Sequence, residues 1–444
     1  MLKKNSVFEV KIAELNSYGY GVCKIDGMAV FVAGAVPGDC ARIRIIKSAK
    51  TYAAAKIDSL ITPSPIRIKP ECDIAGRCGG CVYSHVAYAE EAKSKRQSVE
   101  NELRKAGLRG IKVHELRTPS ETRAYRNKAL IPFSTDGSLG YYAPRTHRAV
   151  TGETPCALLP DIFNEISRHT TRFVQENRIS IYDEQTGTGL LRHLYMRRGA
   201  KTGETMVCLV VNGTLTEGER YAQSIVSAFP CVKTVLLNYN EKNTNVVLGD
   251  RYEVLYGDGI IRDKLCSNTY EISAPSFYQI NRDTAEALYR HAAELAEIKP
   301  DDRVADLYCG IGTIGLSAAA EYEMSTLIGV EIVPEAVENA RRNAELNGIK
   351  NARFYCGDAN DSHIDTCNKI FVDPPRKGLS PALISRMAEL APERVVYISC
   401  APDTLARDIA SLSKFGFSTD EIFTYDMFPR TAHTESLTVL KPKK

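Results

Sequence analysis

Residues 303–315 read RVADLYCGIGTIG, a short apolar run that passes directly into a glycine-rich turn. Gly310, Gly312 and Gly315 have the spacing GxGxxG, which is found where a strand turns into a helix beside a bound dinucleotide. The spacing by itself is equally typical of an ordinary tight turn. The flanking sequence is more informative, because strands and helices alternate after residue 280, which predicts right-handed crossovers in a parallel sheet.

Seven strands and five helices can be placed around this turn. Besides 303–308, the predicted strands are 326–332, 352–358, 369–375, 393–400, 421–428 and 436–440. The predicted helices are 281–298, one directly after the turn, 334–348, one from about 380, and 404–416. A short connection joins the last two strands, so they predict a hairpin that adds antiparallel strands to the end of the sheet.

The N-terminal part has a different pattern, and a chain of 444 residues should hold two or three domains. Residues 5–60 alternate short apolar runs with glycine turns, which predicts five strands in a small barrel of the oligonucleotide-binding type. The segment TPSP at 62–65 is consistent with a linker. Residues 88–107 have a helical pattern, whereas 125–265 read mostly as short strands and turns.

Charge is spread unevenly along the chain. Residues 1–70 hold eleven Lys and Arg against five acids, a net charge of +6, whereas the whole chain carries only +3. A basic module on a nearly neutral body favours a polyanionic partner, with an ordinary solvated surface as the alternative. The sequence has neither a secretory signal nor an apolar run that could span a bilayer, so we expect a cytoplasmic protein with no membrane partner.

Three acids predict a pocket for a cationic nucleoside. Asp306, Glu331 and Asp358 lie at the ends of three successive predicted strands. Glu331 follows Gly312 by 19 residues, where an acid commonly meets ribose hydroxyls. A carboxylate at position 306 suits an amine-bearing ligand better than a pyrophosphate. S-adenosylmethionine fits this pattern better than a nicotinamide cofactor does.

Two further strand ends carry groups that could react. Asp373 begins DPPRKG after the fourth strand, and Cys400 ends the fifth, so both should lie at the carboxyl edge of the sheet. A thiolate there could add to carbon 6 of a uracil. Glu435 precedes the last, antiparallel strand and could serve as the base. The alternatives are a buried structural thiol at 400 and a solvated acid at 435.

In this order, the motifs resemble the TRAM-domain RNA (uracil-5-)-methyltransferases, and the resemblance covers nearly the whole chain. The matching segments are SAPSFYQIN (273–281), DLYCGIGTIG (306–315), GVEIV (329–333), FVDPPRKG (371–378), YISC (397–400), TLARD (404–408) and HTES (433–436). Residues 18–39 also resemble a TRAM barrel, a module that binds RNA. The resemblance implies an OB-like TRAM barrel, a central β-rich domain, and a Rossmann-like class I S-adenosylmethionine-dependent methyltransferase domain with a seven-stranded sheet. The expected boundaries are 1–62, 63–262 and 263–444, and helix 88–107 is expected to pack on the catalytic domain.

The resemblance also implies roles for individual residues. Cys400 would be the nucleophile and Glu435 the general base. The cofactor contacts would come from Gln279, Tyr308, Thr313, Glu331, Asp358 and Asp373. Two positions depart from the family pattern, which usually has Asn where this chain has Ala401 and Val where it has Thr434.

A compact cysteine group lies between the barrel and the helix. Cys72, Cys78 and Cys81 have the spacing C-x5-C-x2-C, and Cys156 follows at a distance. Four thiolates could hold zinc or an iron–sulfur cluster, and the spacing does not decide between them. The resemblance implies a [4Fe-4S] cluster and, with it, 23S rRNA as the substrate, since one branch of the family combines the two.

Other functions are disfavoured by particular residues. RNA cytosine-5 methyltransferases commonly have a cysteine directly after the two prolines, and amino-group methyltransferases an aromatic residue, where this chain has Arg376. A catalytically silent RNA-binding protein would not need Cys400 and Glu435. Methylation of a tRNA uridine stays open, and we expect a monomer without an obligate protein partner.

Overall fold

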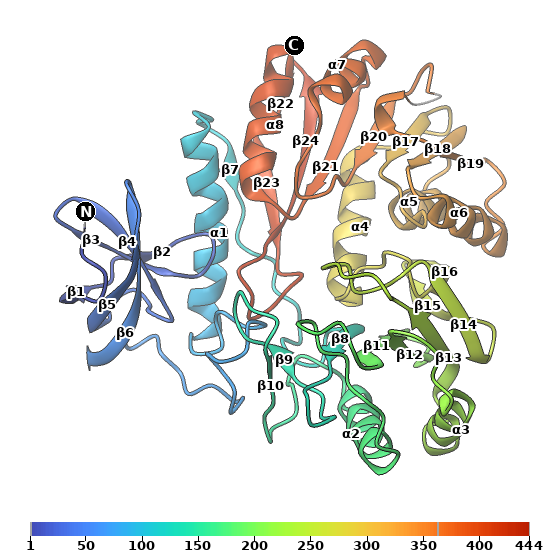
Figure 1. Cartoon of the computed structure of the whole chain (residues 1–444). Helices are drawn as coiled ribbons and strands as arrows, with labels where there is room; N and C mark the ends of the chain where they lie inside the picture. Colours follow the sequence, from blue (N-terminus) through green and yellow to red (C-terminus); the bar gives the residue numbers. More distant parts are fainter. Residues whose placement is uncertain (1, 362–363, 444) are drawn as a thin grey trace.

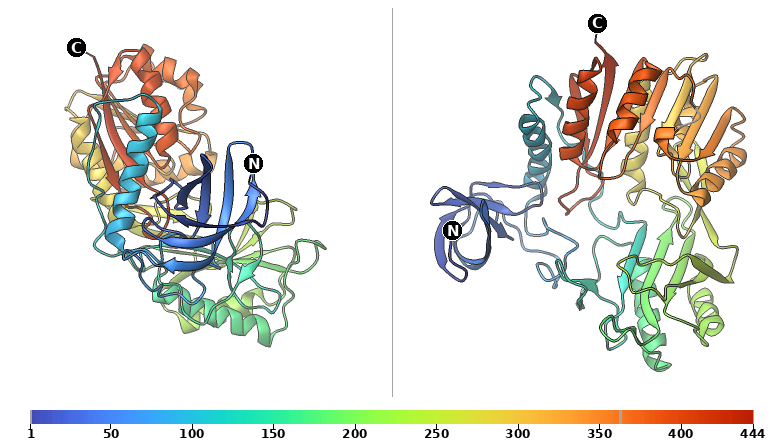
Figure 2. Two further views of the ribbon diagram at one scale, coloured as in Figure 1. Left: turned by 90° about the vertical axis from the view of Figure 1, so that its left-hand side faces the viewer. Right: turned by 45° about the horizontal axis from the view of Figure 1, so that its top comes forward.

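The computed structural model describes residues 2–361 and 364–443, so the outermost predicted domain ends, residues 1 and 444, lie outside the described part. An N-terminal barrel, a central β-rich region and a large sheet covered by helices follow one another along the chain (Figure 1). Both Figure 1 and the right-hand view of Figure 2 show helix α1 (Tyr88–Lys105) between the barrel and the large sheet. In the described residues, no helix combines the length and apolar character needed to cross a membrane.

The barrel contains six strands in its described residues, one more than predicted. They are β1 (Val7–Lys11), β2 (Glu14–Leu15), β3 (Gly21–Ile25), β4 (Met28–Ala33), β5 (Cys40–Ser48) and β6 (Tyr52–Thr62). The sheet order is β1-β5-β6-β4-β3-β2. The extra strand arises because the first apolar run breaks at Ile12 and Ala13, which carry the chain from one edge of the sheet to the other. The sheet thereby closes around Ile12, Val30 and Ile43.

The central region is built on a five-stranded sheet in the order β14-β13-β12-β11-β8. Its strands are β8 (Lys128–Pro132), β11 (Leu191–Arg198), β12 (Thr205–Val211), β13 (Val232–Tyr239) and β14 (Arg251–Tyr256). Two small hairpins accompany it, β9 (Tyr141–Tyr142) with β10 (Ala149–Val150), and β15 (Ile260–Leu265) with β16 (Asn268–Ser273).

Two helices in this region were missed by the sequence reading, which predicted mostly strands and turns. They are α2 (Asp161–Glu176) and α3 (Gly218–Ala228). In α2, the buried residues Phe163, Ile166, Thr170 and Phe173 recur at helical spacing. Apolar side chains of both helices pack into one core with the five-stranded sheet. Short strand-like runs flank α2 and α3, and they made the helical spacing of the apolar residues hard to recognise in the sequence.

The large sheet has nine strands among the described residues, two more than the seven predicted. The seven predicted strands are β17 (Arg303–Leu307), β18 (Thr326–Glu331), β19 (Ala352–Cys356), β20 (Lys369–Val372), β21 (Arg394–Ser399), β23 (Glu421–Tyr425) and β24 (Glu435–Pro442). They lie in the order β19-β18-β17-β20-β21-β24-β23. The additional strands are β22 (Phe417–Ser418), which pairs with β24, and β7 (Lys112–Val113), which pairs with β23. Each has only two residues, too few to give a detectable pattern.

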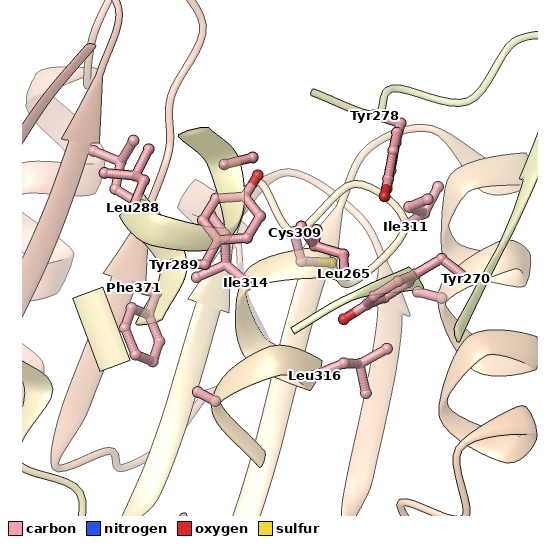
Figure 3. Close-up of a cluster of buried hydrophobic side chains, with 14 of the residues drawn as sticks. Leu265, Tyr270, Tyr278, Leu288, Tyr289, Cys309, Ile311, Ile314, Leu316 and Phe371 are labelled. Carbon is pink, nitrogen blue, oxygen red and sulfur yellow. The ribbon is translucent and has the colours of Figure 1, made fainter. Parts of the chain in front are cut away.

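Helices cover both faces of this sheet. One core contains side chains of α4 (Arg282–Ala296), α5 (Thr313–Glu321) and α6 (Pro334–Leu346), and Figure 3 shows part of it. The other core contains side chains of α7 (Pro381–Leu390), α8 (Pro402–Lys414) and α1, and the 3-10 turn η1 (Ala359–Asp361) adjoins it. Val99 and Leu103 of α1 are buried there with Leu405 and Leu412 of α8. A helix from the N-terminal half of the chain thus completes the layer on this face.

Candidate active site

The glycine-rich turn after β17 is fixed by a buried carboxylate. Asp306 is fully buried, and its Oδ2 accepts a 2.8 Å hydrogen bond from the backbone N–H of Gly315. Its Oδ1 has no hydrogen-bond partner in residues 2–361 and 364–443. Burial, with the nearby charges of Asp373 and Glu331, raises the Asp306 pKa to about 7. Asp306 therefore holds the turn from inside the protein, whereas its strand-end position had suggested an open contact with a ligand amine.

The backbone of the turn is held in an unusual conformation. Gly310 and Gly312 have φ of +55° and +84°, and Tyr308 has φ of +62° although it carries a side chain. Such backbone costs a non-glycine residue about 1–2 kcal/mol, so the surrounding contacts must fix it. Glu331, at the end of β18, supplies one such contact, since its Oε2 accepts from the N–H of Gly310 at 3.2 Å. Its Oε1 accepts from the N–H of Val333 at 2.9 Å.

Tyr308 joins two of the predicted cofactor acids. Burial raises the pKa of its hydroxyl, and the charges of Asp358 and Glu331 add to this effect, so all three side chains share one neighbourhood. Asp358 follows β19 and is exposed, with its Oδ1 accepting from the backbone and side-chain amides of Asn360 at 2.9 and 2.6 Å. Tyr308, Glu331 and Asp358 thus form an open, acidic end of the site.

Tyr289 of α4 lies between the predicted cofactor residues and the acids near Cys400. Figure 3 labels it within the buried core. Its hydroxyl hydrogen-bonds with the side chains of Thr313 and Gln279, and its pKa is raised by burial and by the charges of Asp373 and Glu435. Gln279 is itself buried. One tyrosine thus connects both halves of the site.

Strand pairing brings the second half of the site together. β20 and β21 run parallel, so Asp373 and Cys400, which follow them, lie at the same edge of the sheet. Ser399 of β21 pairs with Ser436 of antiparallel β24. Glu435, the first residue of β24, is therefore next in register to Cys400.

The thiol of Cys400 is half-buried and strongly influenced by its neighbours. Burial raises its pKa to about 11, and the charges of Glu435 and Asp373 contribute in the same direction. Arg376 acts in the opposite direction, through its charge and through a hydrogen bond to the thiol. An Nη2 of Arg376 also lies 3.2 Å from Nε2 of His433.

Glu435 has the surroundings of a proton acceptor that is kept out of water. Its side chain is 2% exposed, and its Oε2 lacks a hydrogen-bond partner in the part of the chain that the structure describes. Burial raises its pKa well above the usual range, and the charge of Asp373 adds to this, whereas Arg376 lowers it. Burial likewise raises the pKa of Asp373 to about 7. A cation bound among these acids would favour their charged forms.

The cysteines from the N-terminal half form a separate group. Cys72, Cys78, Cys81 and Cys156 line one cavity of about 310 Å³. Burial raises the pKa of Cys81 to about 12, and the charges of the other three thiols add to it. In the described residues, no three or more His, Cys, Asp or Glu side chains are arranged to hold a single metal ion.

The predicted site residues at the ends of strands of the large sheet lie at its carboxyl edge; they are Tyr308, Glu331, Asp358, Asp373, Cys400 and Glu435. Sequence reasoning missed the parts played by Tyr289 and Arg376. Tyr289 lies on the inward face of a predicted helix, where an aromatic residue is most simply read as core. In the sequence, Arg376 stands out only as a replacement for the cysteine or the aromatic residue of other methyltransferases, and its position after two prolines is the signal that could have marked it.

Comparison with known proteins gives consistent matches. Residues 254–443 match the family described as tRNA (Uracil-5-)-methyltransferase, and residues 2–57 match the TRAM domain. A protein of Halalkalibacterium halodurans named as an uncharacterized RNA methyltransferase is 38% identical, with 100% of this chain and 98% of the relative covered. A protein of Clostridium tetani with the same description is 35% identical, with 99% and 97% covered.

The fold also matches a solved structure over its whole length. This is the tRNA (uracil-54, C5)-methyltransferase of Pyrococcus abyssi in complex with S-adenosyl-L-homocysteine. The two chains share 27% sequence identity with a TM-score of 0.80, and the match covers 98% of this chain and 100% of the other.

Proposed function

The chain belongs to the family of S-adenosylmethionine-dependent RNA (uracil-5-)-methyltransferases with a TRAM domain, and we propose that it methylates a uridine of 23S rRNA through a covalent bond between Cys400 and carbon 6. The observation that carries this proposal is the position of Cys400 beside Glu435, Asp373 and Arg376 at the edge of the sheet that also bears the glycine-rich turn.

Cys400 is proposed to start the reaction. Its thiolate adds to carbon 6 of the uracil, and the electron pair of the carbon 5–carbon 6 double bond moves into the enolate of the ring. The thiol pKa is raised to about 11, and the charge of Arg376 acts against this rise, so Arg376 is placed to favour the thiolate. Carbon 5 would then attack the methyl carbon of S-adenosylmethionine, and the bond between this carbon and the sulfonium sulfur would break, so that S-adenosylhomocysteine leaves.

Glu435 is proposed to complete the reaction. After methyl transfer, carbon 5 still carries its original hydrogen, which must leave as a proton before the double bond can re-form and the sulfur of Cys400 can depart. A carboxylate that is buried and has a free oxygen is suited to accept it. The raised pKa of Glu435 makes it a stronger base once it is ionised.

The cofactor contacts are proposed for Gln279, Tyr308, Thr313, Glu331, Asp358 and Asp373. The shared surroundings of Tyr308, Glu331 and Asp358 support this, since carboxylates at an open strand edge suit ribose hydroxyls and an adenine amino group. Asp373 lies nearer the reacting groups, because its charge affects both Cys400 and Glu435. A cationic sulfonium bound there would be attracted to these acids.

The cysteine group is proposed to hold a [4Fe-4S] cluster. The four thiols line one cavity, and the charge of Arg126, which also lines it, offsets part of the rise that burial causes in the pKa of Cys78 and of Cys81. A cation beside the cavity suits an anionic thiolate cluster. The absence of a single-ion site in the described residues is compatible with this proposal, since a cubane cluster holds its thiolates farther apart than one tetrahedral metal does.

Ribosomal RNA is proposed as the substrate because the resemblance links this cysteine spacing to the branch that modifies 23S rRNA. The competing substrate is tRNA, and the match to a solved tRNA (uracil-54, C5)-methyltransferase favours it. The TRAM barrel would grip the phosphate backbone in either case, with a strong dependence on salt.

The test uses total RNA from a strain that lacks the gene, incubated with the purified protein and S-adenosylmethionine labelled in the methyl group. We expect label in 23S rRNA, recovered as 5-methyluridine after digestion. Label confined to tRNA would overturn the rRNA assignment, and label recovered as 5-methylcytidine would overturn the uridine assignment.

A further inference from the structure

The loop that leads into Glu435 is held by parts of the chain outside the methyltransferase match. This loop, residues 426–434, connects Tyr425 of β23 to Glu435 of β24, and these two residues pair with each other. The family match begins at residue 254, whereas the helix beside the loop, α1, spans Tyr88–Lys105. Figure 1 shows α1 next to the β23 side of the large sheet.

Lys95 of α1 is the centre of the contact. Its Nζ donates to Oδ1 of Asp426 at 2.7 Å, to Oε1 of Glu91 at 2.8 Å and to the carbonyl oxygen of Phe428 at 3.1 Å. The side chains of Lys95, Glu91 and Asp426 are all completely buried. The hydroxyl of Tyr88 donates to the other oxygen of Asp426 at 2.7 Å. All three donor positions of the ammonium are therefore used, two of them on the 426–434 loop.

Arg430 is the second fixed point of the loop. It has a left-handed backbone with φ of +69°, and its N–H donates to Glu91 at 2.6 Å. Its carbonyl oxygen accepts from the N–H groups of Val82 and Tyr83 at 2.9 and 3.1 Å. These two residues directly follow Cys81, so the cysteine segment and α1 hold the same turn.

The contacts continue from the fixed loop to the reacting groups. The carbonyl of Phe428, which Lys95 holds, also accepts from the N–H of Thr431 at 3.1 Å. The hydroxyl of Thr431 accepts from the N–H of His433 at 3.3 Å, and the ring of His433 meets Arg376, which bonds the thiol of Cys400. Glu435 directly follows Thr434, the last residue of the loop, so a shift of the loop would be felt at Glu435.

Stability alone does not explain this arrangement. The charges balance, because two carboxylates face Lys95 and Arg430, yet a buried ion pair is often no more stabilising than apolar residues of the same size. A buried group of this kind holds the chain in one geometry, because any arrangement that separates the partners leaves a buried charge unpaired. We propose that Lys95 is a positioning residue, which orients the 426–434 loop so that Glu435 can remove the carbon 5 proton.

This inference rests on the proposed roles of Cys400 and Glu435, and it predicts which step fails. Cys400 and the glycine-rich turn follow other strands, β21 and β17, and meet the loop only where His433 contacts Arg376, so addition and methyl transfer should largely tolerate a displaced loop. Proton removal should not. A Lys95→Met variant should therefore form methylated RNA still bound to Cys400, as Glu435→Gln should, and release it slowly.

The experiment follows single-turnover reactions with methyl-labelled cofactor and separates protein-bound from released RNA under denaturing conditions. Lys95→Met should release product about 10- to 100-fold more slowly, with binding of S-adenosylhomocysteine unchanged within about twofold. Lys93→Met is the matched control, because Lys93 lies on the same helix but is 70% exposed. It should release product like the wild type.

A second variant guards against misfolding. Glu91→Gln with Lys95→Met removes one charge of each sign, so the net charge of the buried group is unchanged, and slow release should persist in it. If Glu435→Gln itself accumulates no bound RNA, the proposed function is wrong whatever Lys95 does. If Glu435→Gln accumulates bound RNA but Lys95→Met shows the same proportions of protein-bound and released labelled RNA as Lys93→Met, the positioning role is wrong. Loss of S-adenosylhomocysteine binding in both the single and the double variant would mean that Lys95 and its buried partners are needed for folding, and this result would also overturn the proposal.

Discussion

Ser399 pairs with Ser436 across the antiparallel strands β21 and β24, and this pairing puts Cys400 and Glu435 next to each other at the sheet edge. Only an antiparallel last strand could do this, because a parallel one would begin at the opposite edge. The hairpin that ends the chain therefore serves the site directly, by delivering an acid to the place where the other strands finish.

The first prediction concerns the pH dependence of the Cys400 thiol. Because its pKa is raised to about 11, the thiolate fraction should increase about tenfold for each pH unit between pH 7 and pH 9. Alkylation of Cys400 by iodoacetamide, followed by peptide mass spectrometry, should show this slope in the free enzyme.

Arg376→Gln supplies the matched variant for the alkylation measurement. Since Arg376 lowers the Cys400 pKa, its loss should move the alkylation profile to higher pH and slow alkylation at any fixed pH below the pKa. A profile that levels off near pH 8 in the wild type, or an unchanged profile in Arg376→Gln, would show that these charges do not control the thiol.

The second prediction concerns Ala401, which stands where the family usually has Asn. Ala401 is the N-cap of α8, in extended backbone, and it offers no side chain to accept from the first turn of the helix. Asn is among the best N-cap residues and gains about 0.5–2 kcal/mol over Ala. Ala401→Asn should therefore raise the denaturant midpoint for unfolding of the catalytic domain.

The control for this cap is Ala410→Asn, inside α8, where Asn has a lower helix propensity than Ala. The midpoint should fall slightly in this variant. A lower midpoint in Ala401→Asn than in the wild type would mean that the family's Asn serves the reaction and not the helix end.

Much of the site could be predicted from the sequence because strand ends are marked by local patterns. Gly312, Asp373 and Cys400 each follow an apolar strand, and parallel strands must bring such ends to one edge. Glu435 required one further step, the antiparallel direction of the last strand, which the short connection before it indicated.

Contacts between distant segments could not be predicted in the same way. Lys95 and Asp426 are 331 residues apart and both charged, so each reads as a solvated surface residue until the fold buries them together. The two-residue strand β7 and its pairing with β23 likewise leave no periodic signal. Helix 88–107 is expected to pack on the catalytic domain, but its own sequence does not reveal which charges it would bury.

The third prediction concerns the cysteine group. Protein purified without oxygen should contain about four iron atoms per chain, and Cys81→Ser should lose most of this iron. Cys231→Ser is the control, because Cys231 is also half-buried but packs in the core of the central sheet. Protein that carries zinc and no iron would contradict the cluster.

The measurement that tests the central claim most directly is the capture of RNA containing 5-fluorouridine at the target position. Fluorine cannot leave as a proton does, so the reaction should stop after methyl transfer with the RNA bonded to the enzyme. We expect a protein–RNA complex that survives denaturation, in stoichiometric amount with the wild type, and a digested peptide that carries the modified nucleotide on Cys400. Cys400→Ala should form no such complex while still binding S-adenosylhomocysteine. Equal capture by Cys400→Ala, or attachment to another residue, would contradict the account.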